Sequence, residues 1–221
     1  MKSKTIAIIG ASGRAGKKVV KEALLRGYTL RVLARNPDKI EKDERITVIQ
    51  GDALDAASLD QLLEGAEAVV STLGPTGINQ NLKMAKQSAK DLVCYNSTKQ
   101  LIPLMKKHKI RRFVLTGGAS LSQPEDRNRL WVHLLFTKIS PLFLGVMAKD
   151  RKKEHELLLE SDIDWSIARC GQFIDEEPVG PYKANSARFQ GLKIHTTHIA
   201  QFLLDQLDSD EFLRKAVYIA S

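Results

Sequence analysis

The 221-residue sequence has little of what defines membrane, secreted or metal-binding proteins. No run approaches the roughly 18 apolar residues of a membrane span. The longest candidate, 130–147, is interrupted by a histidine, a lysine, a proline and a glycine. The two cysteines, Cys94 and Cys170, lack metal-ligand spacing, so we expect reduced thiols and no metal site. The first apolar run leads straight into glycines, which is typical of a strand and not of a signal peptide. We therefore expect a cytoplasmic protein with no membrane partner.

The sequence also lacks any recognised nucleic-acid-binding motif, although its net charge is +8. Its Lys and Arg residues are spread along the chain, so the charge favours anionic ligands without indicating a specific nucleic-acid partner. Hydrophobic residues make up 43% of the chain, which is ordinary for a globular protein. The length predicts a single domain over residues 1–221.

Near the N-terminus, an apolar run at 6–9 is followed by Gly10, Gly13 and Gly16 and then by an apolar helical pattern. This order predicts a strand, a turn and a helix that hold a dinucleotide pyrophosphate. In this interpretation Gly10 permits the tight turn, Gly13 lets the backbone approach the phosphates, and Gly16 lets the helix pack closely. The N–H groups at the start of the helix would then face the anion. The alternative is a turn with only a structural role.

Arg35 follows the predicted second strand, 29–34, nineteen residues after Gly16. An NAD site usually has an acidic residue there, which accepts a hydrogen bond from the ribose 2′-hydroxyl. An arginine instead can pair with a 2′-phosphate. Arg14, inside the glycine turn, is a candidate second cation. The position therefore favours NADP over NAD, the alternative being an exposed loop arginine.

Strands alternate with helices along the chain, which predicts an α/β fold with a three-layer, doubly wound parallel sheet (a Rossmann fold). We expect further strands at 46–50, 67–73, 112–116, 164–169 and 216–219. Helices are expected at about 83–107, broken or bent at Pro103, and at 148–161 and 197–207. Another should start near Ala56, with Asp52 as a candidate cap.

The region 120–195 should form a small lobe that supplies most of the substrate-side cover. Within it, 177–191 is rich in turn residues and is predicted to be a loop. The apolar stretch 130–136 is interpreted as a core-facing helix, the alternative being a cover or a partner surface.

Several motifs follow one another in an order typical of one family: GASGRAG, Arg35, GDALD, STLGP, RRFVLTGGAS and EHELLLESDIDWSIAR. Together they resemble the atypical short-chain dehydrogenases/reductases, and among these the biliverdin reductase B (flavin reductase)-like and NmrA-like groups. The resemblance implies an NAD(P)-binding Rossmann domain. It also implies a set of cofactor-binding residues: Gly10, Ser12, Gly13, Arg14, Ala15, Gly16, Arg35, Asp52, Ala53, Leu73, Gly74 and Thr116.

The resemblance is weaker where catalysis would take place. The family's Tyr-x-x-x-Lys pair follows the fifth strand, whereas here Tyr95 and Lys99 precede it. Alignment places Met147 in the tyrosine slot and Arg151 in the lysine slot. Weak candidates that remain for substrate contact are Ser120, His155 and Gln172.

Two functions therefore remain open. One is an NADP(H)-dependent oxidoreductase that transfers a hydride between the nicotinamide and a small flavin- or quinone-like acceptor, whose proton comes from water. The other is a non-catalytic, NADP(H)-binding redox sensor of the NmrA-like type, which would act through a protein partner.

Overall fold

Short runs of aliphatic and β-branched residues form the central sheet of the structure, a computed structural model that describes residues 4–74 and 90–221. The described strands of this sheet lie in the order β3-β2-β1-β4-β5-β6-β10-β8. Strand β8 is antiparallel to β10, and the other pairs are parallel. The strands are β1 (Thr5–Ile9), β2 (Thr29–Ala34), β3 (Ile46–Gln50), β4 (Ala68–Ser71), β5 (Arg112–Gly118), β6 (Asp164–Cys170), β8 (Lys183–Asn185) and β10 (Lys215–Ala220).

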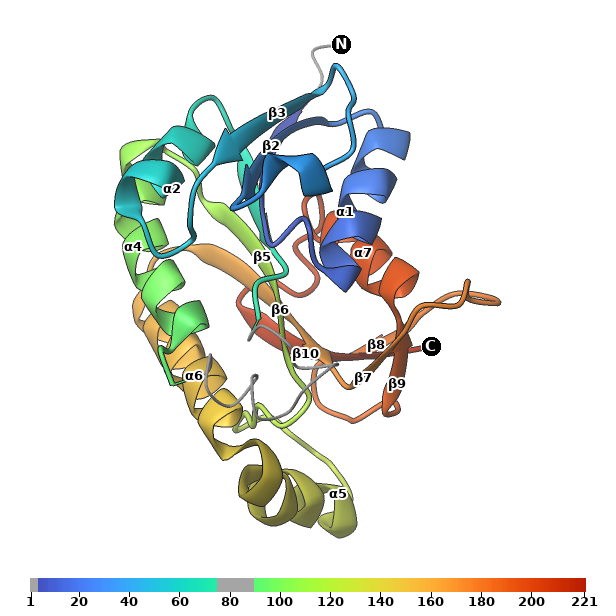
Figure 1. Cartoon of the computed structure of the whole chain (residues 1–221). Helices are drawn as coiled ribbons and strands as arrows, with labels where there is room; N and C mark the ends of the chain where they lie inside the picture. Colours follow the sequence, from blue (N-terminus) through green and yellow to red (C-terminus); the bar gives the residue numbers. More distant parts are fainter. Residues whose placement is uncertain (1–3, 75–89) are drawn as a thin grey trace.

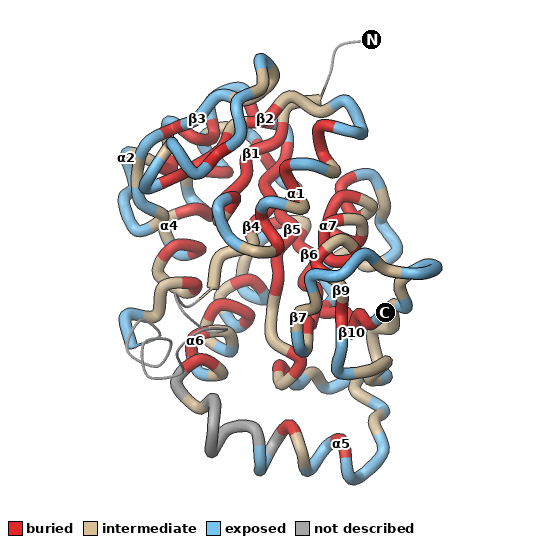
Figure 2. The backbone as a smooth tube through the Cα atoms, turned by 45° about the vertical axis from the view of Figure 1, so that its right-hand side comes forward, coloured by how far each residue is buried: buried red, intermediate tan, exposed pale blue. Residues whose placement is uncertain are grey.

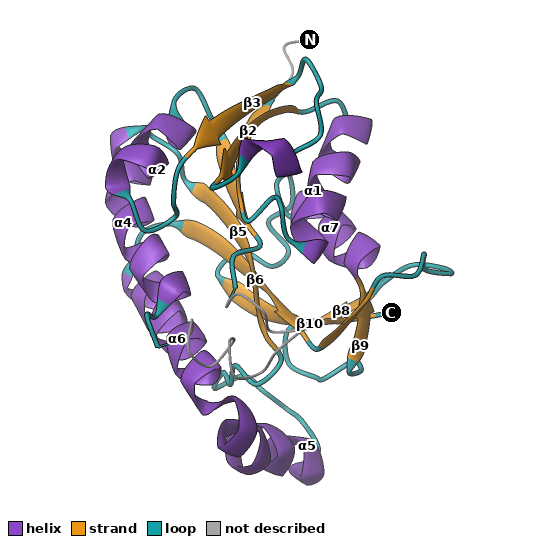
Figure 3. Cartoon of the chain, in the orientation of Figure 1, coloured by secondary structure: helices purple, strands orange, loops and turns teal. Residues whose placement is uncertain are grey.

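Helices cover both faces of this sheet (Figure 1 and Figure 3). One face carries α1 (Arg14–Leu25) and α7 (Thr196–Asp205), and the other carries α2 (Ala56–Leu63), α4 (Val93–Lys107) and α6 (Ser140–Glu160). The predicted doubly wound α/β fold is therefore confirmed, with an antiparallel edge strand added. The remaining elements are the 3₁₀ turn η1 (Pro37–Lys39), α5 (Leu130–Leu134), the π-helical turn η2 (Leu135–Ile139), β7 (Gln172–Ile174) and β9 (Lys193–His195).

The buried strands divide their side chains between two cores. Ile6 and Ile8 of β1 contribute to the core under α1 and α7, while Ala7 and Ile9 contribute to the core under α2 and α4. This is the alternation expected of a strand whose two faces are both covered, because successive side chains point to opposite sides. Figure 2 shows the resulting buried centre, with exposed residues on the outer helix faces and loops.

Helix α1 follows directly from its sequence pattern. Its buried residues recur one and four positions apart from Ala15 to Leu24, which gives one apolar face. The helix ends where Gly27 takes a φ of 81°, with the N–H groups of Gly27 and Tyr28 bonded to the carbonyls of Leu24 and Ala23. A left-handed glycine at this position is a common helix stop.

Several local predictions need correction. Asp55, and not Asp52, caps α2: its carboxylate accepts from the N–H of Ser58 at 2.8 Å, whereas Asp52 accepts from the N–H of Leu54. Helix α4 continues through Pro103 to Lys107, so of the two expected alternatives the internal break is wrong. The predicted start of this helix, 83–89, lies outside the described residues.

The C-terminal third holds more structure than its sequence indicates. Helix α6 begins at Ser140, eight residues before the predicted start at 148. The predicted loop 177–191 contains strand β8, and the flanking segments β7 and β9 pair in parallel as a separate small sheet. Strands this short carry almost no sequence signal, because three residues cannot display an alternating pattern. Among the helices in the described part of the chain, none combines the length and hydropathy needed to cross a membrane.

Candidate functional site

The turn after β1 needs glycine at two positions for measurable reasons. Gly10 has a φ of 84°, and a Cβ there would lie 2.9 Å from the backbone carbon of Thr72. A Cβ on Gly16 would lie 2.1 Å from the carbonyl oxygen of Gly10, so only glycine lets α1 approach the turn so closely. Gly13 is different: it is exposed, and a Cβ there would have one neighbour within 4 Å, the Gly10 oxygen at 3.2 Å. The space in front of Gly13 is therefore open to a ligand.

The N-terminus of α1 is suited to an anion. Gly13 is its N-cap residue, no side chain caps the helix, and the first turn contains no acidic residue. The N–H groups of this turn therefore have no side-chain acceptor, and the positive end of the helix dipole faces the open side of the turn. Ser12 is exposed beside the turn, and Ala15 is buried beneath it.

The ends of β2 and β3 bring three more predicted residues to the same edge of the sheet. Arg35 directly follows β2, is exposed, and makes no hydrogen bond or ion pair with any described residue. Parallel pairing places Asp52 and Ala53 just beyond β3, because Ala34 lies opposite Gln50. A hollow of about 310 Å³ lies between the glycine turn and the segment after Arg35. Lys17 and Lys39 line it together with Asp38 and Glu41, so its lining has no net charge.

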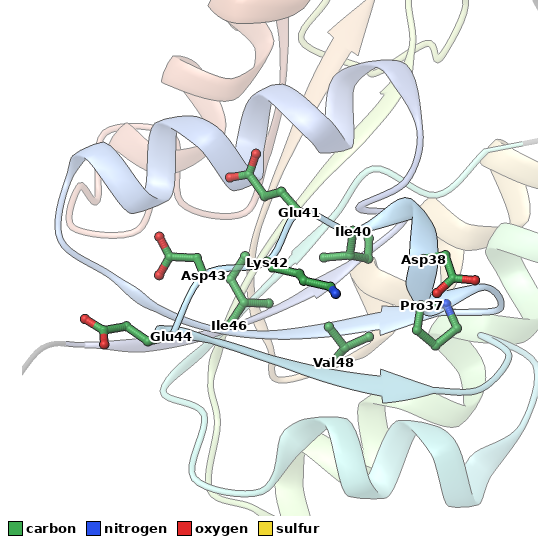
Figure 4. A pocket seen from close by; sticks show the side chains of 9 residues that line it. All are labelled: Pro37, Asp38, Ile40, Glu41, Lys42, Asp43, Glu44, Ile46 and Val48. Atoms are coloured by element: carbon green, nitrogen blue, oxygen red, sulfur yellow. The ribbon is translucent and has the colours of Figure 1, made fainter.

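A larger hollow, of about 570 Å³, lies outside the phosphate site (Figure 4). Ile46 and Val48 of β3 form its floor, and the segment 37–44 runs over it. Four acidic residues line it beside one lysine, Lys42, so its net negative lining repels phosphate groups; the four are Asp38, Glu41, Asp43 and Glu44. Although this hollow is larger than the one beside the glycine turn, its acidic lining makes it unsuitable for the cofactor phosphates.

Arg14 does not point freely at the phosphate position. Its guanidinium pairs with the Asp175 carboxylate at 2.8 Å and donates to the carbonyl of Phe173 at 3.2 Å. Lys18, one turn later, pairs with Glu177 at 2.5 Å. The segment 173–177 is therefore fastened to the first two turns of α1, a contact that no sequence motif signals.

The other predicted cofactor residues follow β4 and lie within β5. The Leu73 carbonyl accepts from the Arg151 guanidinium at 2.5 Å, and the thiol of Cys94 lies 3.8 Å from the same oxygen. A Cβ on Gly74 would lie 3.8 Å from Arg151. Thr116 is buried in β5. Arg151, the residue in the lysine slot, thus holds the segment after β4, which the resemblance assigns to the ribose and nicotinamide.

Arg151 belongs to a buried polar cluster between α4 and α6. Its guanidinium pairs with Glu154 at 2.6 Å, and Glu154 also accepts from the Thr98 hydroxyl at 2.8 Å. Asp150, fully buried, accepts from the N–H groups of Cys94 and Tyr95 at 3.1 and 2.9 Å and so caps the start of α4 from another helix.

Burial sets the protonation behaviour of this cluster. It raises the pKa of Glu154 despite the contact with Arg151, and it raises the pKa of the Cys94 thiol well above its ordinary value. Burial acts to lower the pKa of Arg151, but the neighbouring carboxyl groups of Glu154 and Asp150 raise it by more. Arg151 therefore stays charged, facing two buried carboxyl groups.

Sequence reasoning missed this cluster, although a signal was present. Met147, Asp150, Glu154 and Leu158 recur three or four positions apart, which is the spacing of one helix face. Charged residues on such a face are usually solvated, so the pattern alone does not predict that Asp150 and Glu154 are buried.

The structure separates the three weak catalytic candidates. Ser120 and Gln172 follow β5 and β6 at the same edge of the sheet, because Gly118 lies opposite Cys170. Ser120 is half-buried and the Gln172 side chain is exposed. His155 instead is buried against Trp165, the second residue of β6, at 5.3 Å between ring centroids. Trp165 lies at the amino end of β6, so the structure places His155 away from Ser120 and Gln172.

The structure also places the residues related to the family's Tyr-x-x-x-Lys pair. Met147 is buried and has no proton to donate. The ring of Tyr95 lies on α4 between the ammonium groups of Lys99 and Lys153, at 5.9 and 5.4 Å from its centroid. Tyr95 and Lys99 thus belong to the helical layer before β5, as their position in the sequence indicates.

Comparisons with known proteins agree with this geometry. A family model described as NAD(P)H-binding matches residues 10–210. The chain is 28% identical over 172 residues to the uncharacterized protein YwnB of Bacillus subtilis, covering 77% of this chain and 73% of YwnB. It is 26% identical over 223 residues to the photosystem II assembly factor Ycf39 of Cyanophora paradoxa, covering 97% of this chain but only 60% of Ycf39.

The fold is shared with solved structures. A short-chain dehydrogenase/reductase of Veillonella parvula, crystallised in complex with NADP, superimposes with a TM-score of 0.76 at 18% sequence identity. The alignment covers 100% of this chain and 95% of that one. At this identity the likeness shows the fold, while the family match covers nearly the whole chain. The protein belongs to the NAD(P)H-binding family, and its Rossmann fold is that of the short-chain dehydrogenase/reductase on which it superimposes.

Proposed function

We propose that the protein is an NADP(H)-dependent reductase of a flat, flavin- or quinone-like acceptor. The observation that carries this proposal is the anion site at the start of α1. There a glycine turn opens onto a helix end without a side-chain cap, and the exposed Arg35 lies at the end of the neighbouring strand. Both features fit a dinucleotide with an additional phosphate.

The preference for NADP rests on the side chains around Arg35. Arg14 is already paired with Asp175, whereas Arg35 has no partner among the described residues. The adjacent hollow is lined by two lysines and two acidic residues and adds no net charge, so the preference rests on Arg35 itself. A 2′-phosphate would gain charge-assisted hydrogen bonds there that a 2′-hydroxyl would not.

The choice of acceptor follows from the lack of a proton-donating side chain at the positions of the family's Tyr-x-x-x-Lys pair. Bound NADPH supplies a hydride, and the protein has to position the acceptor against it. Neither Met147 nor Arg151 is available as a proton donor, because the first is apolar and the second is bound to Leu73 and Glu154. Ser120 and Gln172, at the ends of adjacent strands, are the groups proposed to orient the acceptor. Flavins and quinones suit such a site because water can protonate them.

The second candidate function is a redox sensor that binds NADP(H) without turnover. The contact between Arg14 and Asp175 favours it, because a phosphate competing for Arg14 would release the segment 173–177. A partner protein would then detect the released segment. The match to a relative named as an assembly factor is compatible with this function.

Cofactor preference is tested by titrating the purified protein with NADPH and with NADH, followed by fluorescence. Arg35→Asp should raise the Kd for NADPH by about 10- to 150-fold, the equivalent of the roughly 1.5–3 kcal/mol of a charged phosphate pair. The Kd for NADH should change little. Arg188→Asp is the matched control, because Arg188 is also exposed and lies in the β8–β9 connection. Equal losses for both cofactors would contradict the assignment to Arg35.

Turnover decides between the two functions. FMN or a soluble quinone is added to the NADPH complex, and oxidation of NADPH is followed over time. Steady oxidation, weakened by Ser120→Ala or Gln172→Ala, supports the reductase. Tight binding with no oxidation across the acceptor panel supports the sensor.

A further inference from the structure

The segment between Asp126 and Asp150 has an unusual composition. It contains no Asp or Glu, while Arg127, Arg129, Lys138 and Lys149 are all within it. These four basic side chains are exposed. The segment includes α5 and η2, which form the far tip of the molecule, away from the central sheet (Figure 1).

The tip is apolar on two faces. On the inner face, Val132 and Phe136 are buried, and the Phe136 ring lies 5.1 Å from Phe189 and 6.2 Å from Tyr218. These contacts attach the tip to the body of the protein. The outer face carries the apolar residues whose exposed fractions are 73% for Leu130, 58% for Trp131, 44% for Leu134 and 48% for Ile139.

The outer face is not explained by the inner core. A helix that is apolar on both sides is normally covered on both sides. Figure 2 shows that most of α5 is exposed, so no described element covers it. Four exposed apolar residues close together, flanked by Arg129 and Lys138, form what we call the tip patch. A contiguous patch of this kind marks an interaction surface more often than an accident of packing.

The positive charge around the tip patch indicates what kind of surface would cover it. In a two-fold dimer through this face, the basic residues of both copies would be brought together, and neither copy has a carboxylate within the segment to offset them. An anionic surface has the opposite charge. Tryptophan and leucine beside arginine and lysine are also the residues by which helices lie in the interface of an anionic bilayer.

We propose that the tip patch, consisting of Arg129, Leu130, Trp131, Leu134, Lys138 and Ile139, docks the protein on an anionic lipid surface. Leu130, Trp131, Leu134 and Ile139 enter the headgroup region, while Arg129 and Lys138 contact the lipid phosphates. This contact needs no membrane-spanning helix, and none is found among the described helices. The proposal departs from the expectation of no membrane partner, which rested on the lack of a membrane-spanning run. The proposal holds whether or not the protein turns over an acceptor.

Trp131 makes the proposal directly measurable. The only other tryptophan, Trp165, is fully buried in the core. Vesicles of phosphatidylcholine with about 30% phosphatidylglycerol should blue-shift the Trp131 emission, and brominated lipid should quench it. Vesicles of phosphatidylcholine alone should have little effect, and added salt should weaken the binding.

Two pairs of variants test the residues assigned to the patch. Arg129→Glu with Lys138→Glu should lower the vesicle partition coefficient by about 30-fold or more, because each cation near such a surface contributes about fivefold. Lys21→Glu with Lys193→Glu changes the net charge by the same amount at exposed positions elsewhere. This control pair should lower the partition coefficient much less. Trp131→Gln should also weaken binding, whereas Leu25→Gln, which alters another highly exposed leucine, should not.

Other results would overturn the proposal. These are no binding of the wild type to phosphatidylglycerol vesicles at low salt, or equal losses in the patch variants and their controls. A concentration-dependent dimer that Trp131→Gln dissociates would identify a second copy as the occupant. Because the altered side chains are exposed, unchanged thermal unfolding confirms that each variant is folded.

Discussion

The two ends of the candidate cofactor site are built in different ways. At the phosphate end, Gly10, Gly13 and Gly16 lie within seven residues of one another, and Arg35 follows the next strand. At the opposite end, Leu73 is held by Arg151, which comes 78 residues later. The first end is made of backbone and local turns, and the second of a buried network between two helices and a strand.

This difference determines how each end fails. The phosphate end depends on the absence of side chains, so adding atoms damages it. The other end depends on a charge pair in a buried place, so removing one partner damages it. Substitutions of each kind test the comparison.

The largest effect is expected for Arg151→Met. It would leave Glu154 buried without its cation, which costs about 3–5 kcal/mol of unfolding free energy. The double variant Arg151→Met with Glu154→Leu should recover much of this loss, because no unpaired charge remains at these two positions. Urea unfolding of the single and double variants measures both. A single variant as stable as the wild type would show that the pair does not hold this end.

Gly16→Ala should cause the next largest loss of unfolding free energy. Its Cβ would lie 2.1 Å from the Gly10 oxygen, so the helix or the turn must move, at a cost of about 2–3 kcal/mol. Gly27→Ala is the matched control. It also faces a backbone constraint, a φ of 81°, but no atom lies within 4 Å, so about 1 kcal/mol is expected. Equal costs in chemical unfolding would contradict the close approach of α1 to the turn.

A smaller change is expected for Asp175→Asn. It frees Arg14 for the cofactor phosphates and should tighten NADPH binding by up to about fivefold, since an exposed ion pair contributes about 1 kcal/mol or less. Glu177→Gln removes the same charge nearby but leaves Arg14 paired, so its effect should be smaller. If both variants tighten binding alike, the effect is general electrostatics and not release of Arg14.

The smallest effect concerns pH. Burial, together with the nearby charge of Arg169, lowers the pKa of His155 below its ordinary value of 6.5. The unfolded chain therefore binds a proton at higher pH than the folded one, and stability falls as pH drops from 6.5 through the lowered pKa. His155→Gln should flatten this slope in thermal unfolding. Some slope should remain, because burial also lowers the pKa of His198. An unchanged slope would show that His155 does not titrate with folding.

The sequence predicted the regular part of the fold well because each element there is specified locally. Strand β1 and helix α1 carry uninterrupted patterns, and a left-handed glycine, Gly27, ends the helix. Asp55 as the cap of α2 and the continuity of α4 through Pro103 were missed, because both depend on small differences between neighbouring local options.

The sequence was less informative where function depends on distant contacts. The charges of α6 look like a solvated face, yet Asp150 and Glu154 are buried because α4 lies across them and supplies their partners. Ser120 and Gln172 were chosen as candidates together with His155, and only the sheet register separates the first two from the third. Pairing between strands is a property of the folded sheet and not of any single segment.

By itself, the sequence determined the parallel α/β fold and the glycine turn with its neighbouring Arg35, because strand and helix periodicity and the steric freedom of glycine act over a few residues. Only the tertiary structure decided that Arg14 pairs with Asp175, that Arg151 holds Leu73, and that the apolar residues on the outer face of α5 are exposed. These features depend on segments that meet only after the chain has folded, where burial and pairing determine the energy of each charge.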